Sequence, residues 1–111
     1  MCSSDLRLLG RYVREQRVIS LEEAIRKGTG AVAQRLTLRD RGMLTEGSYA
    51  DVIVFDPTTV IDRATFEQPG QLSVGIEQVF VNGKAVISDG KHTNAKPGKA
   101  LRGVGWTGRS R

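Results

Sequence analysis

The sequence is poor in the residues that metal sites and covalent cross-links require. Of its 111 residues, one is a cysteine (Cys2) and one is a histidine (His92). A single cysteine excludes an internal disulfide and a cysteine-rich zinc site. Aromatic residues make up only 5% of the chain, so any core that it builds alone has few large side chains to bury.

Long apolar runs are also missing. No stretch approaches the ~20 residues that a membrane-spanning helix needs, and the N-terminus has no signal-peptide pattern. We therefore expect no membrane partner and, by default, a cytoplasmic protein. With 111 residues, the chain suits at most one small domain, which buries well under three quarters of its unfolded surface.

The formal net charge of +5 is unevenly distributed along the chain. Residues 1–41 carry nine Lys/Arg against five acids, residues 42–90 carry two against seven, and residues 91–111 carry six against none. A basic tail can bind phosphate groups, but the cations here are not interleaved with aromatic residues as they are in single-strand binders. We therefore predict no nucleic-acid partner, and a solvated, disordered basic tail over residues 104–111. A free-standing basic nucleic-acid-binding module stays as the weaker alternative.

The first six residues differ in character from the rest. Cys2-Ser3-Ser4-Asp5-Leu6 is the peptide that one reading frame of a common sequencing-adaptor end encodes, whereas a short serine-rich leader is the plainer interpretation. The adaptor interpretation predicts that residues 1–6 are a non-native leader. The native sequence then begins near Arg7.

Helical patterns occupy the first third of the chain. Residues 8–15 place apolar side chains at helical spacing with charged residues opposite. Further along, Ser20 and Glu23 form a capping box, in which the Ser20 hydroxyl accepts from the Glu23 N–H and the Glu23 side chain reaches back. Thr29, or the glycine after it, caps another turn over residues 31–36. These segments are too short to be stable alone, so they require a surface to pack against.

Strand patterns follow from Gly42 onward. Residues 52–55 (Val-Ile-Val-Phe) form a continuous apolar run, which predicts a strand buried on both faces, and Asp56-Pro57 ends it. Residues 61–71 read as an irregular connection. A hairpin follows, with strands 76–81 and 84–87 around Asn82-Gly83, a pair that tolerates the positive φ angles of a type I′ turn. Asp89-Gly90 predicts a second turn, and we expect poor order from Lys91 onward.

The motif of residues 42–56, with two glycine turns and an Ala-Asp step into an apolar run, resembles the amidohydrolase superfamily. Other segments resemble N-acyl-D-amino-acid deacylases (D-aminoacylases) in particular. These segments are Leu9–Glu15, Ser20–Ala24, Leu38–Gly42, Asp62–Glu67, Gly75-Ile76, Val81–Gly83, Gly90–Thr93 and Pro97-Gly98. Dihydropyrimidinase-like and dihydroorotase-like amidohydrolases share only the first motif and stay as the alternative.

The resemblance implies an α+β fragment of a larger enzyme. Residues 7–41 are then the last helices of a TIM-type amidohydrolase barrel. Residues 42–103 are the C-terminal part of a small composite β-sandwich domain, with its hairpin at 76–88. The parent hydrolyses the amide bond of N-acyl-D-amino acids with zinc-activated water. The partners implied are the N-terminal barrel and β-strands of that parent.

The resemblance carries over no catalytic, metal-binding or cofactor-binding residue, because no position here matches the family's histidines or its strand-end aspartate. We therefore predict no site residue of any kind, no cofactor bound by this chain, and a structural role without activity. His92 alone cannot hold zinc. Asp51 and Asp56 lie at opposite ends of one strand and on opposite faces. Turn or strand-end roles also account for Asp40, Asp62 and Asp89, and Ser3 and Ser4 lack the context of a nucleophile.

Overall fold

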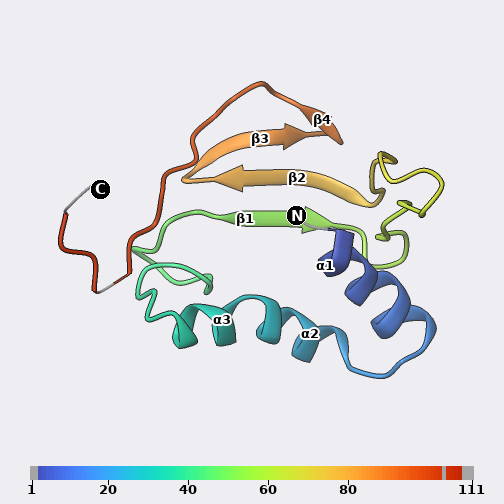
Figure 1. Ribbon diagram of the computed structural model, residues 1–111, viewed down its shortest axis with the longest axis horizontal. Coiled ribbons are helices and arrows are strands. Elements are labelled where there is room, and N and C mark those ends of the chain that lie inside the picture. The colour runs from blue at the N-terminus through green and yellow to red at the C-terminus, as the bar shows by residue number, and fades with distance from the viewer. Residues whose placement is uncertain (1–2, 104, 109–111) are drawn as a thin grey trace.

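The computed structural model describes residues 3–103 and 105–108. Helices come first in the chain and strands second, as Figure 1 shows. The helical elements are α1 (Ser3–Arg7), the π-helix η1 (Leu8–Glu15) that continues it, α2 (Leu21–Gly28) and α3 (Gly30–Arg35). The strands are β1 (Val52–Phe55), β2 (Ile76–Val81), β3 (Lys84–Ser88) and β4 (Lys91–His92). The predicted change from helix to strand is confirmed.

The start of α2 follows the predicted capping chemistry in part. The Ser20 hydroxyl accepts a hydrogen bond from the Glu23 N–H at 3.2 Å. The Glu23 carboxylate does not reach back but accepts from Arg26, at 2.6 and 2.7 Å. Thr29, one of the two predicted caps, occupies the N-cap position of α3, but its side chain makes no cap bond there. Its hydroxyl instead donates to the Ile25 carbonyl at 2.8 Å.

The four strands form one antiparallel sheet in the order β1-β2-β3-β4. The β2–β3 hairpin turns at Asn82 and Gly83, whose φ angles of 49° and 77° are both positive. This confirms the predicted turn, because both central positions of a type I′ turn need positive φ. The predicted turn at Asp89-Gly90 is also present, with φ angles of 49° and 71°.

Two expectations about the strands need correction. Residues Ile53 and Val54 of β1 are 38% and 42% exposed, so β1 is not buried on both faces. The reason is its position, because β1 is the outer strand of the sheet and only β2 pairs with it in the described part of the chain. The prediction of poor order from Lys91 onward is wrong for Lys91 and His92. These two residues follow the turn and pair with β3 as strand β4.

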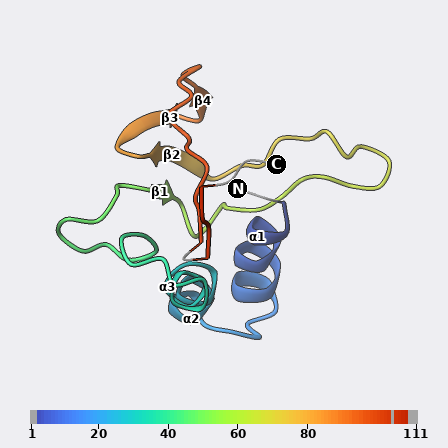
Figure 2. The ribbon, with the colours of Figure 1, turned by 60° about the vertical axis from the view of Figure 1, so that its left-hand side comes forward.

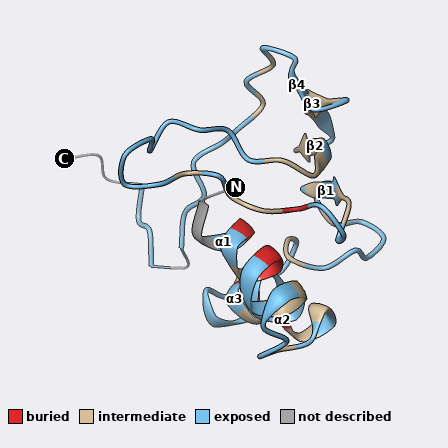
Figure 3. Cartoon of the chain, turned by 90° about the vertical axis from the view of Figure 1, so that its right-hand side faces the viewer, coloured by how far each residue is buried: buried red, intermediate tan, exposed pale blue. Residues whose placement is uncertain are grey.

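The core lies between the helices and the segment that follows β1, where Figure 3 shows the buried residues gathered. Its centre is Val60, which is fully buried, together with Leu6, Leu9 and Ala24. Leu6 is only 2% exposed. A side chain of the predicted leader therefore takes part in the core, and whether residues 1–6 are native stays a prediction.

Gly10 of η1 and Gly75 before β2 allow the chain to pass close to Val60. A Cβ atom on Gly10 would lie 2.7 Å from the Val60 carbonyl oxygen, and one on Gly75 would lie 2.5 Å from the Val60 backbone. The Arg14 guanidinium donates to that same carbonyl at 2.7 Å. Figure 2 shows the helices on one side of the molecule, beyond β1. The helical layer therefore joins the sheet through the segment around Val60.

The predicted disordered tail, residues 104–111, is described only at 105–108, and the rest lies outside the described residues. Within it, the Trp106 N–H donates to the Gly103 carbonyl at 3.0 Å. The Trp106 ring is 55% exposed, and the Arg102 guanidinium lies 4.9 Å from its centroid. Disorder of this tail stays a prediction.

Candidate functional site

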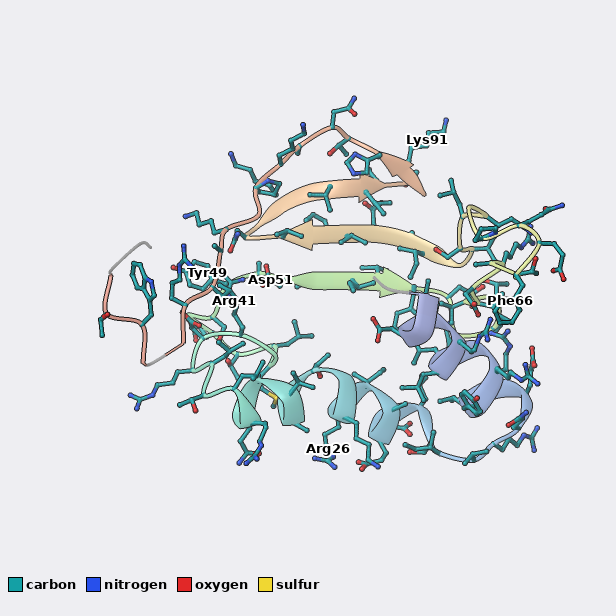
Figure 4. The ribbon with its side chains drawn as sticks, in the orientation of Figure 1. Arg26, Arg41, Tyr49, Asp51, Phe66 and Lys91 are labelled. Carbon is teal, nitrogen blue, oxygen red and sulfur yellow. The ribbon has the colours of Figure 1, made fainter. Side chains whose placement is uncertain are left out.

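The densest group of polar contacts lies where the helical layer, the start of β1 and the β2–β3 turn meet. We call it the Arg41 junction and define it by Arg41, Tyr49, Asp51, Asn82 and Pro97. The Arg41 side chain is only 10% exposed and is ion-paired with Asp51. It donates to the Asn82 side-chain oxygen at 2.6 Å and lies 4.3 Å from the centroid of the Tyr49 ring. Figure 4 shows Arg41, Tyr49 and Asp51 together at one end of β1.

The other contacts of the junction connect it to the backbone. The second Asp51 oxygen accepts from the Asn82 N–H at 2.8 Å, and the Asn82 side-chain amide donates to the Pro97 carbonyl at 2.8 Å. The side chains of Arg41, Asp51 and Asn82 therefore all have hydrogen-bond partners in other parts of the chain. Since the Asp51 carboxylate is occupied by two donors, it is poorly suited to act as a general base. The junction fixes the relative positions of three segments.

A surface hollow of about 420 Å³ lies next to the junction. Its lining includes four cationic side chains and one acidic one: Arg39, Arg41, Lys99, Arg102 and Asp40. A second hollow of about 470 Å³ shares Thr37, Leu38, Arg39 and Arg41 with it. Neither is lined by cysteine or histidine, so neither offers a strong nucleophile or an imidazole base.

The aspartates considered in the sequence lie apart and have structural partners. Asp56 accepts from the Thr58 N–H at 2.8 Å, the Thr58 hydroxyl at 2.7 Å and the Thr59 hydroxyl at 2.9 Å. The Thr58 hydroxyl and N–H, followed by the Thr59 hydroxyl, hold the pKa of Asp56 below its ordinary value. Asp62 is ion-paired with Arg7 at 2.9 Å. The turn role predicted for Asp56 is confirmed, whereas the pairing of Asp62 with Arg7, 55 positions away, was not foreseen.

The remaining candidates are equally separate from one another. His92 is exposed, and its Nδ1 accepts from the Asn94 N–H at 3.1 Å. The Asp89 side chain accepts from the Gln78 amide at 3.1 Å, across the turn. The Asp40 carbonyl accepts from the Tyr49 N–H at 3.0 Å. The side chains of Ser3 and Ser4 lie outside the described residues.

Metal ligands do not cluster in residues 3–103 and 105–108. In that part of the chain, no three His, Cys, Asp or Glu side chains lie close enough to bind one ion. Over the same residues, no helix combines the length and the apolar character needed to cross a bilayer. The polar residues described above hold segments of the fold together.

Comparison with known proteins identifies the fold. The model of the amidohydrolase family matches residues 3–87, so this chain belongs to the amidohydrolase family. Within that family it is similar to D-aminoacylases. It is 49% identical over 96 residues to N-acyl-D-glutamate deacylase from Alcaligenes xylosoxydans xylosoxydans and 50% identical over 95 residues to N-acyl-D-aspartate deacylase from the same organism. These matches cover 86% and 85% of this chain.

Solved structures give the same result. A crystal structure of D-aminoacylase matches with a TM-score of 0.79 and 45% identity, over 82% of this chain and 19% of that one. N-acyl-D-glutamate deacylase from Bordetella bronchiseptica, solved with zinc and a phosphonate inhibitor, matches with a TM-score of 0.80 and 46% identity, over 87% and 20%. The predicted resemblance to D-aminoacylases is confirmed. The chain spans about a fifth of the length of the curated relatives that it matches.

Proposed function

We propose that this chain is the C-terminal portion of a zinc-dependent amidohydrolase that hydrolyses the amide bond of N-acyl-D-amino acids, and that it is structural and inactive alone. One observation carries the proposal. The chain is about half identical to two N-acyl-D-amino-acid deacylases over 86% and 85% of its own length, yet spans only 20% and 19% of theirs. Most of such an enzyme then lies in sequence that this chain does not contain.

The proposal divides the chain as the motifs suggest. Residues 7–41 are the last helices of the barrel, and residues 42–103 are part of the composite β-domain. The order of elements supports this division, since the last helix ends at Arg35 and the first strand begins at Val52. The proposed partners are the barrel and the β-strands of the parent, in a cytoplasmic protein.

Zinc belongs to the proposed parent and not to this chain. The Bordetella bronchiseptica relative was solved with zinc and a mimic of the tetrahedral intermediate. In hydrolases a bound zinc ion lowers the pKa of its water and polarises the scissile carbonyl. Such an ion is held by three protein ligands with an open fourth position. This chain has one histidine and one cysteine, and within residues 3–103 and 105–108 no three His, Cys, Asp or Glu side chains are grouped so that they could hold a metal ion. The described residues therefore do not fit a zinc site.

The first test uses the purified 111-residue chain with added zinc. N-acetyl-D-glutamate, N-acetyl-D-aspartate and their L-enantiomers are supplied separately, and release of the free amino group is measured. We expect no hydrolysis above that of a zinc-only control. Turnover of any of these substrates would refute the claim that the chain is inactive alone.

The second test concerns the parent. The source DNA is read upstream of Arg7, and the protein encoded by the longer frame is purified with zinc. We expect this protein to deacylate the N-acetyl-D-amino acids in preference to the L-forms. A preference for dihydrouracil or dihydroorotate would instead support the other amidohydrolase classes. A stop codon followed by a genuine start signal ahead of Met1 would contradict the proposed parent.

A further inference from the structure

The β2–β3 turn contains a chemically reactive pair of residues. Asn82 is followed directly by Gly83, and the backbone nitrogen after an asparagine can attack the carbon of its side-chain amide. Glycine has no Cβ atom to hinder that approach. A Cβ atom built on Gly83 would meet nothing within 4 Å, and Gly83 is exposed. Water therefore has access to the turn.

This attack is the first step of deamidation. A bond forms between the Gly83 nitrogen and the side-chain carbonyl carbon of Asn82, and the bond from that carbon to Nδ2 breaks. The Nδ2 group leaves as ammonia, with the proton that the Gly83 nitrogen gives up. Water then opens the resulting succinimide ring at either of its carbonyl groups. The product is aspartate or isoaspartate, and in isoaspartate the main chain passes through the former side chain and is longer by one atom.

The fold holds both reacting groups in hydrogen bonds. The Gly83 N–H donates to the Ala50 carbonyl at 3.0 Å. The Asn82 Oδ1 atom accepts from Arg41 at 2.6 Å, and Nδ2 donates to the Pro97 carbonyl at 2.8 Å. Because the side-chain amide is bound at both its oxygen and its nitrogen, it cannot rotate toward Gly83 while these bonds persist. Attack by Gly83 also requires loss of the N–H that is bound to Ala50.

We propose that Asn82 is a site of spontaneous deamidation, that the Arg41 junction protects it, and that its modification disrupts the junction irreversibly. The reaction then proceeds only from the small population in which all three bonds are open. A neutral hydrogen bond contributes about twofold or more to such an equilibrium, and one to a charged group more than about tenfold. Folding is therefore expected to slow deamidation of Asn82 at least about fiftyfold.

Both products remove contacts of the junction. Neither has the Nδ2 donor, so the Pro97 carbonyl loses its partner. Isoaspartate also lengthens a turn in which Val81 pairs directly with Lys84, and a two-residue turn matches the twist of its strands only with its normal backbone. All of these contacts lie within this chain, so the proposal does not rest on the proposed parent.

Deamidation of the full chain in native buffer and in guanidinium chloride tests the protection. Both samples are kept at the same mildly alkaline pH, and peptide mapping by mass spectrometry follows each asparagine. Asn94 is the internal control, since it is followed by Ala95 and its side chain makes no hydrogen bond within the described part of the chain. In denaturant Asn82 is expected to react faster than Asn94, because the Ala95 side chain hinders attack. Folding should slow Asn82 at least about fiftyfold and Asn94 much less. Slowing of Asn82 by less than this factor, or by no more than that of Asn94, would overturn the protection.

Arg41→Lys tests whether the junction itself protects Asn82. Two nitrogens of the Arg41 guanidinium donate to Asp51 and Asn82, whereas lysine has a single nitrogen and keeps only the charge. This variant is expected to deamidate at Asn82 at least about tenfold faster in native buffer. Gly10→Ala is the matched control, because Gly10 lies against Val60 and away from the junction, and its rate at Asn82 should equal that of wild type. Equal acceleration in both variants, or in neither, would overturn the role of the junction. Circular dichroism checks that both variants fold, and the comparison of wild type in the two buffers stands where Arg41→Lys does not.

The isoaspartate product tests the consequence. Chain modified in guanidinium chloride is separated from unmodified chain, and both are returned to native buffer for urea unfolding. The unfolding constant of the isoaspartate chain is expected to be at least about tenfold larger, because the bond to Pro97 and the pairing across the turn are lost. Equal urea midpoints for the two chains would overturn the claim that modification disrupts the junction.

Discussion

A methyl group at Gly10 is expected to destabilise the chain, although alanine is the better helix former. The added Cβ atom would lie 2.7 Å from the Val60 carbonyl oxygen and 2.8 Å from Cγ1 of Ile61. That carbonyl also accepts from Arg14 at 2.7 Å. It therefore cannot move away without losing this hydrogen bond.

Two opposing effects decide the magnitude. Helix propensity favours alanine over glycine by about 1 kcal/mol, whereas overpacking of a well-packed site costs about 1–3 kcal/mol. Because the carbonyl is held in place, we take the upper part of that range. Gly10→Ala is then expected to lower the free energy of unfolding by about 1–2 kcal/mol.

Gly28→Ala is the matched control. Gly28 is the last residue of α2, and a Cβ atom there would meet no atom within 4 Å. Only the propensity term remains, so this variant is expected to gain about 0.5–1 kcal/mol. The two substitutions are chemically identical, and they are expected to have opposite signs.

Thermal unfolding followed by circular dichroism, at one fixed protein concentration, measures both variants. For a domain of this size, 1 kcal/mol corresponds to a shift of about 4–8 °C in the midpoint. The midpoint of Gly10→Ala should fall and that of Gly28→Ala should rise. If Gly10→Ala is as stable as the control variant, the close contact between η1 and Val60 is wrong.

Three further perturbations test other parts of the fold. Ser20→Ala removes the acceptor at the start of α2 and is expected to cost about 1 kcal/mol in urea unfolding, and an unchanged midpoint would count against the cap. Asn82→Ala loses the contacts to Arg41 and Pro97 and keeps a residue with a side chain at positive φ, so it is expected to lower the free energy of unfolding by about 2–3 kcal/mol. Asn82→Gly removes the φ strain but not the loss of these contacts, so, if the junction matters, it should recover only part of that stability. The pKa of Asp56 is lowered by folding, so its contribution to stability is present above its unfolded pKa and is lost as pH falls through its folded pKa. Asp56→Asn should therefore flatten the dependence of the urea midpoint on pH below about pH 4, and an unchanged slope would show that the Thr58 and Thr59 bonds do not form.

The elements that sequence reasoning predicted correctly depend on local chemistry. Ser20 accepts from an N–H only three residues away, and Asn82-Gly83 adopts the positive φ angles that asparagine and glycine tolerate better than other residues. The D-aminoacylase resemblance was recognised because its motifs are continuous stretches of sequence. In each case, the evidence lies within a few neighbouring residues.

The features that were missed depend on residues far apart in the sequence. Glycine is a poor helix former, so the pattern of residues 8–15 gives no reason for Gly10, whereas its missing side chain is what allows contact with Val60. Asp62 appeared to be a turn residue, but it pairs with Arg7. The exposure of β1 could not be read from its apolar run, because burial depends on which elements cover a strand. Arg41 had no feature in the sequence that distinguished it from the other cations.

The meeting of η1 with Val60 also has a consequence for the order in which the chain folds. The helices and the β2–β3 hairpin are built from contacts between near neighbours, which form within microseconds. The Arg7–Asp62 pair and the Gly10–Val60 contact close loops of about fifty residues. Closing such a loop costs conformational entropy before the contact can stabilise the chain, so these contacts are expected to form late in folding. We expect Gly10→Ala to act mainly on the unfolding rate and Asn82→Ala on the folding rate, as stopped-flow measurements of both variants can check. A larger slowing of folding by Gly10→Ala would mean that the two layers meet early in folding.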